Sequence, residues 1–280
     1  MRAFISVDLE GMPFVVSPQH LIEKGALYAE ARKIATEITL TAAEALYEAG
    51  FSEIVIADSH GPMVNILPEE LPEYVYLVRG YPRPIAMIAG AEDSDVALFL
   101  GYHAKAGTFH AIFDHTYSGA NVGKLELNGV EVSEYLLNAY AVGHYGIPAV
   151  LVGGDEKLLE DDVERFTPWA ERIPFKRAFS RYSAISPSLK VLKKDLEDGI
   201  FKAIEKYRKG GTRPLELEYP IRVRLTFNNS GMADVGELLP GANRVDGKTV
   251  EFEAKDIIEA YKAFQLLVFA ASGVTSLFRR

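Results

Sequence analysis

The sequence predicts an α/β fold, with an open, mostly parallel sheet and flanking helices in the N-terminal part and a smaller α+β C-terminal domain. Residues 3–8 and 54–57 are short apolar runs rich in β-formers, and residues 25–49 between them repeat apolar side chains at helical spacing. Residues 96–100 and 148–152 are uninterrupted apolar runs, which are typical of strands buried on both faces of a parallel sheet. After about residue 175, apolar and polar residues alternate instead.

The first elements form a βαβ unit. The helix predicted over 25–49 ends at Gly50, the residue expected after a helix, and joins the strands at 3–8 and 54–57. Such a connection implies parallel pairing and a right-handed crossover. Another strand is predicted at 74–78, and a short helix at 85–89.

The middle of the chain adds a hairpin and two helices. Asn128-Gly129 is a strong turn signal, so residues 124–131 are predicted to form a hairpin. Residues 134–145 are predicted to be helical and end at Gly146. An acidic helix over 156–166 follows the strand at 148–152.

The last third contains the elements of the α+β part. We expect an amphipathic helix at 189–207, half-exposed strands at 221–227 and 249–253, and a C-terminal helix that starts near residue 255. These patterns predict two domains, 1–175 and 176–280.

Composition limits the classes of function. Of the 280 residues, 48% are hydrophobic and 25% are charged, as in an ordinary soluble protein, and the net charge of −9 offers no basic footprint for nucleic acid. No apolar run reaches about 18 residues, so we expect no membrane span, and the apolar stretch near 260–272 predicts a buried helix or a subunit interface. The chain has no cysteine, which fits a cytoplasmic protein and restricts any metal to oxygen and imidazole ligands.

Four short polar motifs carry the candidate chemistry: SVDLEG at 6–11, DSHG at 58–61, GYHA at 101–104 and DHT at 114–116. The first three each follow a predicted strand, and ligands of open α/β sheets bind at the carboxyl ends of the strands. Asp8 and Glu10 are two residues apart in extended chain, so both carboxylates face one way and repel unless a proton or a cation lies between them. The motifs together predict a hydrolytic metal site.

Each candidate also has a structural interpretation. Asp8 and Glu10 can be an acidic helix cap with a solvated neighbour. His60 is either a bystander in an Asp58-Ser59 turn or a ligand whose tautomer Asp58 fixes, and a lone His103 at a strand end is usually structural.

Two further residues lie outside the strand ends. His115, in a polar loop, is either a ligand or a proton-transfer group, and His110 in the same loop is a weaker candidate for substrate contact. Glu134 is most simply a favourable charge in the first turn of a helix.

The motifs occur in one order that resembles the D-aminopeptidase family of zinc metallopeptidases. The resemblance includes SEYLLNAY at 133–140 and extends to KDIIEAYKAF at 255–264, so it covers most of the chain. It implies two Zn²⁺ ions per subunit, with Asp8 as the bridging carboxylate. The implied metal ligands are Asp8, Glu10, His60, His103 and Glu134.

The resemblance also implies roles for the remaining parts. His115 matches the catalytic histidine, and Ser133 departs from the glycine expected before Glu134, which concerns the geometry of that loop. Domain 1–175 becomes the metal-binding catalytic domain, and domain 176–280 is expected to contribute to the substrate pocket and to oligomer contacts. The family resemblance further implies a homo-oligomer, a decamer of two stacked pentamers.

The expected function is therefore a zinc-dependent aminopeptidase that releases N-terminal residues, D-amino acids among them, from short peptides or amides through a metal-activated water. A two-metal phosphoesterase is the enzymatic alternative, although the motif loops hold only Lys105 and Lys124 to balance a phosphate. The non-enzymatic alternative is a metal- or peptide-binding assembly protein.

Overall fold

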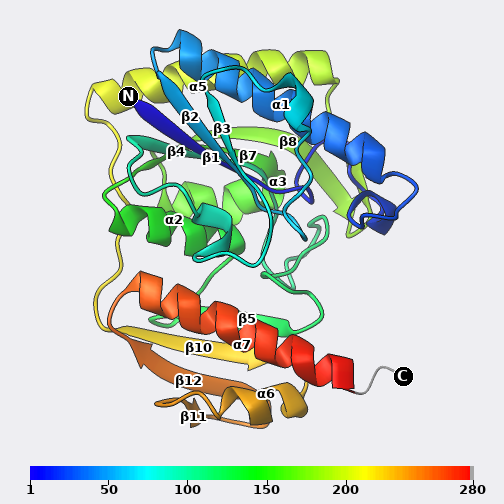
Figure 1. Ribbon diagram of the computed structural model, residues 1–280, viewed down its shortest axis with the longest axis vertical. Helices are drawn as coiled ribbons and strands as arrows, with labels where there is room; N and C mark the ends of the chain where they lie inside the picture. Colours follow the sequence, from blue (N-terminus) through cyan, green and yellow to red (C-terminus); the bar gives the residue numbers. More distant parts are fainter. Residues whose placement is uncertain (278–280) are drawn as a thin grey trace.

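The computed structural model describes residues 1–277 and contains two sheets (Figure 1). Sheet A has the strand order β3-β2-β1-β4-β7-β8-β9, and all neighbouring pairs are parallel except β8 with β9. Its strands are β1 (Arg2–Val7), β2 (Glu53–Asp58), β3 (Val75–Val78), β4 (Val96–Tyr102), β7 (Ala149–Asp155), β8 (Glu171–Ser180) and β9 (Ser183–Ile185). The predicted α/β class is confirmed.

Sheet B is antiparallel, with the order β11-β12-β10-β5-β6. Its strands are β5 (Val122–Leu127), β6 (Val130–Glu131), β10 (Ile221–Phe227), β11 (Asn243–Arg244) and β12 (Thr249–Ala254). The hairpin predicted at Asn128-Gly129 is present between β5 and β6, and both turn residues have positive φ, 49° and 80°.

Helices cover both faces of sheet A and separate it from sheet B (Figure 1). Helices α1 and α5 pack together on one face, whereas α2 lies on the other face and contacts α7, which in turn packs on β10 and β12. The larger helices are α1 (Tyr28–Glu48), α2 (Glu134–His144), α5 (Leu189–Arg208), α6 (Ser230–Gly236) and α7 (Ile257–Leu277).

The remaining helical segments are short. The acidic segment after β7 is α3 (Glu156–Leu158), a π-helical turn η4 (Leu159–Val163) and α4 (Glu164–Phe166). Three 3₁₀ turns complete the described elements: η1 (Pro18–His20), η2 (Pro68–Glu70) and η3 (Ala86–Ile88).

Alternation along β1 distributes its side chains between two cores. Ala3, Ile5 and Val7 pack with α1 and α5, whereas Phe4 belongs to the core that fills the space between sheet A, α2, α7 and sheet B. Because successive strand residues point to opposite faces, Ser6 lies on the α2 side with Phe4. Asp8, two residues further along, therefore points toward the space between sheet A and sheet B.

The observed layers do not follow a division after residue 175. That position lies inside β8, a strand of sheet A, and α5 packs against α1 on the same sheet. In the other direction, β5 and β6 come from the first half of the chain but pair in sheet B with β10. The two sheets therefore exchange segments across residue 175.

Helix α7 is longer than the apolar stretch that predicts it. By length and composition alone its 21 residues would suffice to cross a membrane, since an 18-residue window within it has a mean hydropathy of 1.4. Eight of its side chains are nevertheless buried, among them Tyr261, Phe264 and Val268 in the core against sheet B. We interpret α7 as a core helix, one of the two possibilities that the sequence leaves open beside a subunit interface.

A candidate metal centre at the carboxyl ends of the strands

The predicted site residues meet at one edge of sheet A. Val7 of β1 is in register with Asp58 of β2 and Leu100 of β4, so the three strands end at the same level. Asp8, His60 and His103 follow these ends within two residues, and Glu134 is the first residue of α2. The residues predicted as ligands therefore lie together, as expected for an open α/β sheet.

Two glycines allow the β1 and β4 ends to approach. A side chain on Gly11 would lie 2.0 Å from the carbonyl oxygen of Tyr102, and one on Gly101 would lie 2.0 Å from that of Asp8. The backbone N–H of Gly11 donates to the carbonyl of Gly101 at 2.7 Å, and that of Asp8 donates to Leu100 at 2.8 Å. Both motifs need glycine at this close approach.

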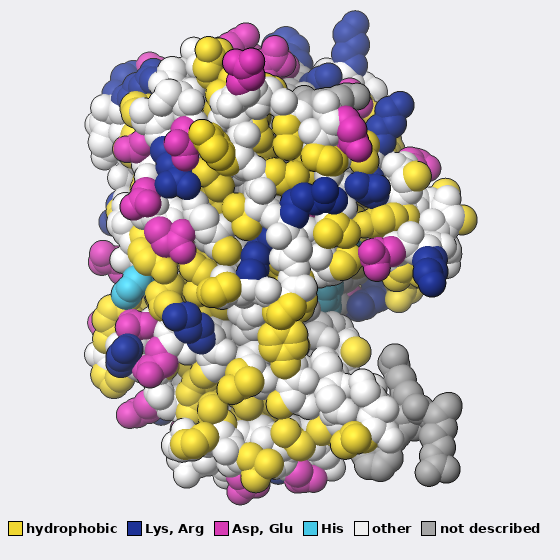
Figure 2. Space-filling view, in the orientation of Figure 1, with side chains coloured by type: hydrophobic (Ala, Val, Ile, Leu, Met, Phe, Trp, Pro, Cys, Tyr) yellow, Lys and Arg dark blue, Asp and Glu magenta, His cyan; other side chains and the backbone are white. Residues whose placement is uncertain are grey.

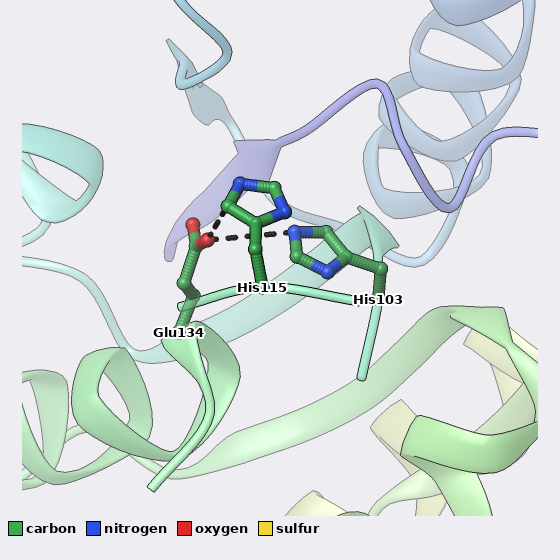
Figure 3. A group of neighbouring side chains, drawn as sticks. All are labelled: His103, His115 and Glu134. Carbon is green, nitrogen blue, oxygen red and sulfur yellow. Dashed lines mark ion pairs between the residues drawn. The ribbon is translucent and has the colours of Figure 1, made fainter. Parts of the chain in front are cut away.

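Asp8 lies between two histidines. Its Oδ1 is 3.5 Å from Nδ1 of His60, and its Oδ2 is 3.5 Å from Nε2 of His103. Glu10 Oε2 is 2.8 Å from Nδ1 of His60 on the first side. On the second side, Glu134 Oε1 is 3.4 Å from Nε2 of both His103 and His115, as Figure 3 shows. The central position of Asp8 suits a carboxylate that bridges two cations.

Backbone carbonyls orient all three imidazoles. Nε2 of His60 is 2.8 Å from the Leu21 carbonyl, Nδ1 of His103 is 3.0 Å from that of Ala104, and Nδ1 of His115 is 2.7 Å from that of Phe113. An imidazole that donates to a carbonyl through one nitrogen presents the other as an acceptor or ligand. In each case the second nitrogen faces the carboxylates.

Asp58 does not orient His60. Its carboxylate accepts hydrogen bonds from the Asn65 side chain and from the Ile66 backbone, both at 2.7 Å, so it closes the loop after β2. The expected role of Asp58 as the partner of His60 is therefore wrong, because the Leu21 carbonyl already occupies the outward-facing ring nitrogen.

Burial and mutual charge shift the pKa values of the carboxylates. Burial, together with repulsion from Glu10, raises the pKa of Asp8 well above its usual range. Burial also opposes ionisation of Glu10, but attraction to His60 outweighs it and holds the Glu10 pKa well below its usual range. The cluster thus concentrates negative charge that positive charge must balance.

The histidines respond in two ways. Burial disfavours protonation of His103, but its contact with Glu134 and the charges of Asp8 and Glu10 raise its pKa to about 10. Burial and the neighbouring His103 instead lower the pKa of His115. His115 therefore presents a neutral imidazole more readily than His103 does.

The donor set fits a divalent metal of the zinc type. Oδ2 of Asp8 and Nε2 of His103 are buried, have no hydrogen-bond partner within the described part of the chain, and face each other. Two groups of ligand atoms each lie within 4.8 Å: one from Asp8, Glu10 and His103, the other from His103, His115 and Glu134. Carboxylate oxygen and imidazole nitrogen are ligands that zinc accepts.

His115 lies at the open side of this cluster. Its side chain is 18% exposed, whereas that of His103 is fully buried and that of His60 is 10% exposed. The geometry brings its Nε2 as close to Glu134 as that of His103, so the structure permits both a ligand and a catalytic role. Because the His115 side chain is more exposed than those of His60 and His103, it is better placed to contact a substrate.

Some features of the site carry no sequence signal. The backbone N–H of Tyr117 donates to Glu134 Oε1 at 2.6 Å, and Lys176 of β8 is buried beneath the loop that follows Glu10. A backbone N–H is present in almost every residue type, so the sequence cannot mark it as a donor. Lys176 comes close to the site only because β8 joins sheet A. A predicted strand at 171–180 would have been needed to find the lysine.

The remaining predictions concern single residues. Ser133, in place of the expected glycine, accepts a hydrogen bond from the Leu136 N–H at 3.1 Å and caps α2. Glu134 therefore keeps its place in the first helical turn. His110 is exposed and stacks on Phe109, so the structure does not bring it into the cluster.

Comparison with known proteins gives a consistent result. A family model described as D-aminopeptidase matches residues 1–266. The chain is 30% identical over 269 residues to a D-aminopeptidase of Bacillus subtilis (strain 168), covering 95% of this chain and 96% of the relative. A solved structure, the Zn-dependent D-aminopeptidase DppA from Bacillus subtilis, described as a self-compartmentalizing protease, superposes with a TM-score of 0.92 at 30% identity and covers 97% of this chain and 98% of its own.

Proposed function

The chain belongs to the D-aminopeptidase family, and from that premise we propose that it is a zinc-dependent D-aminopeptidase whose site is the cluster around Asp8. Asp8, with one carboxylate oxygen toward His60 and the other toward His103, is the observation that carries the proposal. We further propose two zinc ions per subunit. Asp8, Glu10 and His60 would hold one ion, and Asp8, His103 and Glu134 the other.

Zinc in such a site supplies an activated water at neutral pH and polarises the scissile carbonyl. The protein supplies the rest. Asp8 and Glu134 bring negative charge that binds cations, and the carbonyls of Leu21 and Ala104 hold His60 and His103 in ligating orientation. The burial of these groups excludes bulk water from the ligands.

His115 is proposed as the catalytic group. Its Nδ1 is held by the Phe113 carbonyl at 2.7 Å, so Nε2 is the atom that faces the reacting groups. From the open side of the cluster, His115 as an imidazolium can donate the Nε2 proton to the leaving amine or stabilise the oxyanion of the tetrahedral intermediate. A neutral imidazole can alternatively accept a proton from the attacking water.

The carboxylates also provide for the substrate's N-terminus. A free ammonium or amine next to the scissile carbonyl would meet the negative charge of Glu10 or Glu134. A blocked N-terminus would lose that interaction, so the site would act as an exopeptidase. The proposed substrates are short peptides and amino-acid amides with a free N-terminal D-residue.

The phosphoesterase alternative loses its remaining support. Lys105 pairs with Asp162 at 2.8 Å and Lys124 with Glu126 at 3.2 Å, so the two lysines of the motif loops already have carboxylate partners. Neither is available to balance a phosphate dianion.

We propose a homo-oligomer, a decamer of two stacked pentamers. The related structure is described as self-compartmentalizing. On this chain, Leu238 and Leu277 are large hydrophobic side chains with 76% and 77% exposure. Toward the C-terminal end of α7, the face seen in Figure 2 carries mainly hydrophobic and uncharged side chains, as an interface requires. The cytoplasmic location stays a prediction.

The test of function is direct. Full-length protein, stripped with a chelator and then reloaded with zinc, is assayed on matched D- and L-alaninamide and on N-acetyl-D-alaninamide. We expect zinc-restored hydrolysis of D-alaninamide, weaker hydrolysis of the L-amide and none of the acetylated amide. Zinc content by elemental analysis should approach two per chain. A loaded enzyme that hydrolyses none of these amides would contradict the proposal.

A further inference from the structure

A cavity of about 210 Å³ opens beside Glu134, between the two layers of the molecule. Its walls include Gly61 and Met63 from the loop after β2, Tyr117 from the His115 loop, and Val268 and Phe269 from α7. Because Gly61 follows His60 and Glu134 itself forms part of the wall, the cavity adjoins both sides of the metal centre.

The lining is uncharged apart from Glu134. Met63 and Met87 contribute buried thioethers, and the rings of Tyr81 and Phe269 lie 5.3 Å apart at one side. A side chain that enters this space meets flexible thioethers and aromatic rings beside hydroxyl groups, with Glu134 as the one charged group of the lining, which suits an uncharged side chain.

Two of the lining hydroxyls, those of Ser59 and Ser272, already have partners, whereas the buried Tyr117 hydroxyl has none within the described part of the chain. Ser59 Oγ is 3.0 Å from Ser6 Oγ and donates to the carbonyls of Ala57 and Met87. Ser272 Oγ donates to the Val268 carbonyl at 2.9 Å and accepts from Asn121 at 2.7 Å. An acidic side chain would therefore find no cation and would meet the charge of Glu134.

The chemistry of an aminopeptidase decides which side chain belongs here. In the released residue, one carbon separates the free amine from the scissile carbonyl, so its side chain branches beside the metal ligands. The Tyr117 N–H donates to Glu134 Oε1 at 2.6 Å, which fixes this cavity wall to a proposed ligand. We infer that the cavity receives the side chain of the released residue, that it selects uncharged side chains, and that Phe269 limits their size; this inference rests on the proposed function.

Phe269 is suited to set the limit. It is 39% exposed on α7 and packs on Tyr81, so its truncation widens the cavity with little loss from the buried core. Ser272, one turn further along α7 and exposed, offers the opposite change, because a larger side chain there would fill the same space. Leu266 lies on α7 with 57% exposure but lines a different groove, which makes it the matched control.

The experiment compares zinc-loaded full-length wild type with Phe269→Ala, Ser272→Leu and Leu266→Ala. The kcat/KM for D-phenylalaninamide relative to D-alaninamide should rise about tenfold in Phe269→Ala, fall in Ser272→Leu and stay constant in Leu266→Ala. Dipeptides with N-terminal D-alanine that differ only in the second residue should show no such change. Affinities for D-alanine and D-phenylalanine hydroxamates, measured by calorimetry, provide a readout without turnover.

The outcomes separate this inference from the proposed function. Hydrolysis with unchanged selectivity in both cavity variants overturns the pocket and leaves the function standing. A response to the second residue rather than the first overturns the assignment of the side chain. Hydroxamate affinities that shift as expected, without hydrolysis of any amide, support the pocket and contradict the function. Light scattering on each variant measures whether assembly is unchanged. If Phe269→Ala dissociates, the selectivity of Ser272→Leu alone tests the role of the cavity.

Discussion

His115 combines a fixed ring with access to solvent. Its Nδ1 is tied to the Phe113 carbonyl, its Nε2 lies 3.4 Å from Glu134, and its side chain is more exposed than that of His60 or His103. We expect His115→Ala to lower kcat by about 10²- to 10⁴-fold, the usual range for a proton-transfer group, while zinc content stays at the wild-type value. Steady-state kinetics and elemental analysis check both parts.

His110→Ala is the matched control, since His110 lies in the same loop but stacks on Phe109 away from the cluster. If His115→Ala loses zinc together with activity, His115 is a ligand and its catalytic role is refuted.

Lys176 is a buried base beneath the site. Its Nζ donates to the Val15 carbonyl at 2.5 Å, the residue is 1% exposed, and the carboxylates of Asp155, Glu10 and Asp8 attract its positive charge. Burial outweighs the attraction of these carboxylates and lowers the pKa of Lys176 to about 7. The unfolded chain, with an ordinary lysine pKa, keeps the proton to a higher pH.

This difference predicts how stability depends on pH. Between about pH 7 and the ordinary lysine pKa near 10.4, the unfolded state binds more protons than the folded state, so the Lys176 contribution to the free energy of unfolding rises with pH, by at most about 1.4 kcal/mol per unit. Below about pH 7 both states hold the proton and this slope vanishes. The difference in the free energy of unfolding between wild type and Lys176→Met, measured with urea from pH 6 to 9, should therefore be constant below about pH 7 and change in favour of wild type above it. Parallel curves over the whole range would show that Lys176 is charged when folded.

At the scale of elements, the loop that carries His115 is braced from β8 and β9. Asp114 forms an ion pair with Arg181 at the tip of that hairpin and accepts a hydrogen bond from the Gly107 N–H at 2.7 Å. The Phe113 N–H donates to the Arg181 carbonyl at 3.1 Å. His115 is thus positioned by a hairpin that contributes no side chain to the cluster.

We expect Arg181→Ala to lower kcat on the order of ten- to a hundredfold, because small displacements of a catalytic group are costly. Zinc content and KM should change little, and Arg181→Lys should recover part of the rate. Arg177→Ala, an exposed arginine of β8 that packs on Phe179, is the control. An Arg181→Ala enzyme with the wild-type kcat would show that the backbone bond to Phe113 suffices.

The sequence predicts best those elements that are determined by residues close together in the chain. The β5–β6 hairpin follows from Asn128-Gly129, since the turn and both strands lie within ten residues. The sequence does not predict strand β8, because Pro174 interrupts its pattern and prolines are unusual within strands. Only the family resemblance implies a metal-binding role for Glu134, since a helix N-terminus explains its charge equally well without a metal.

For the whole molecule, the pattern predicts the class of fold but not the exchange of segments between sheets. β5 pairs with β10 about a hundred residues away, and α5 returns to α1; both contacts depend on packing that no local pattern records. The strand-end motifs could be placed because parallel strands share one carboxyl edge. Distances such as those from Asp8 to its two histidines, and the cavity wall from α7, required the structure.

Zinc at this centre would connect segments far apart in the sequence: the ends of β1, β2 and β4 and the start of α2. Metal that binds only the folded chain adds about 2.7 kcal/mol to the free energy of unfolding at a free concentration one hundred times its dissociation constant. We expect Asp8→Asn to lose most of this zinc-dependent gain. Thermal and urea unfolding after chelation and after reloading check it.

Without zinc, the difference in stability between Asp8→Asn and wild type should have the opposite sign. Asp8 is buried beside Glu10 and Glu134, so Asp8→Asn removes repulsion, and the chelated variant should be at least as stable as chelated wild type. Asp93→Asn, a change at an exposed carboxylate, should keep the full zinc effect. If Asp8→Asn is instead stabilised by zinc as strongly as wild type, Asp8 is not the bridge. A variant less stable than wild type only when zinc is present is the result that a bridging carboxylate requires.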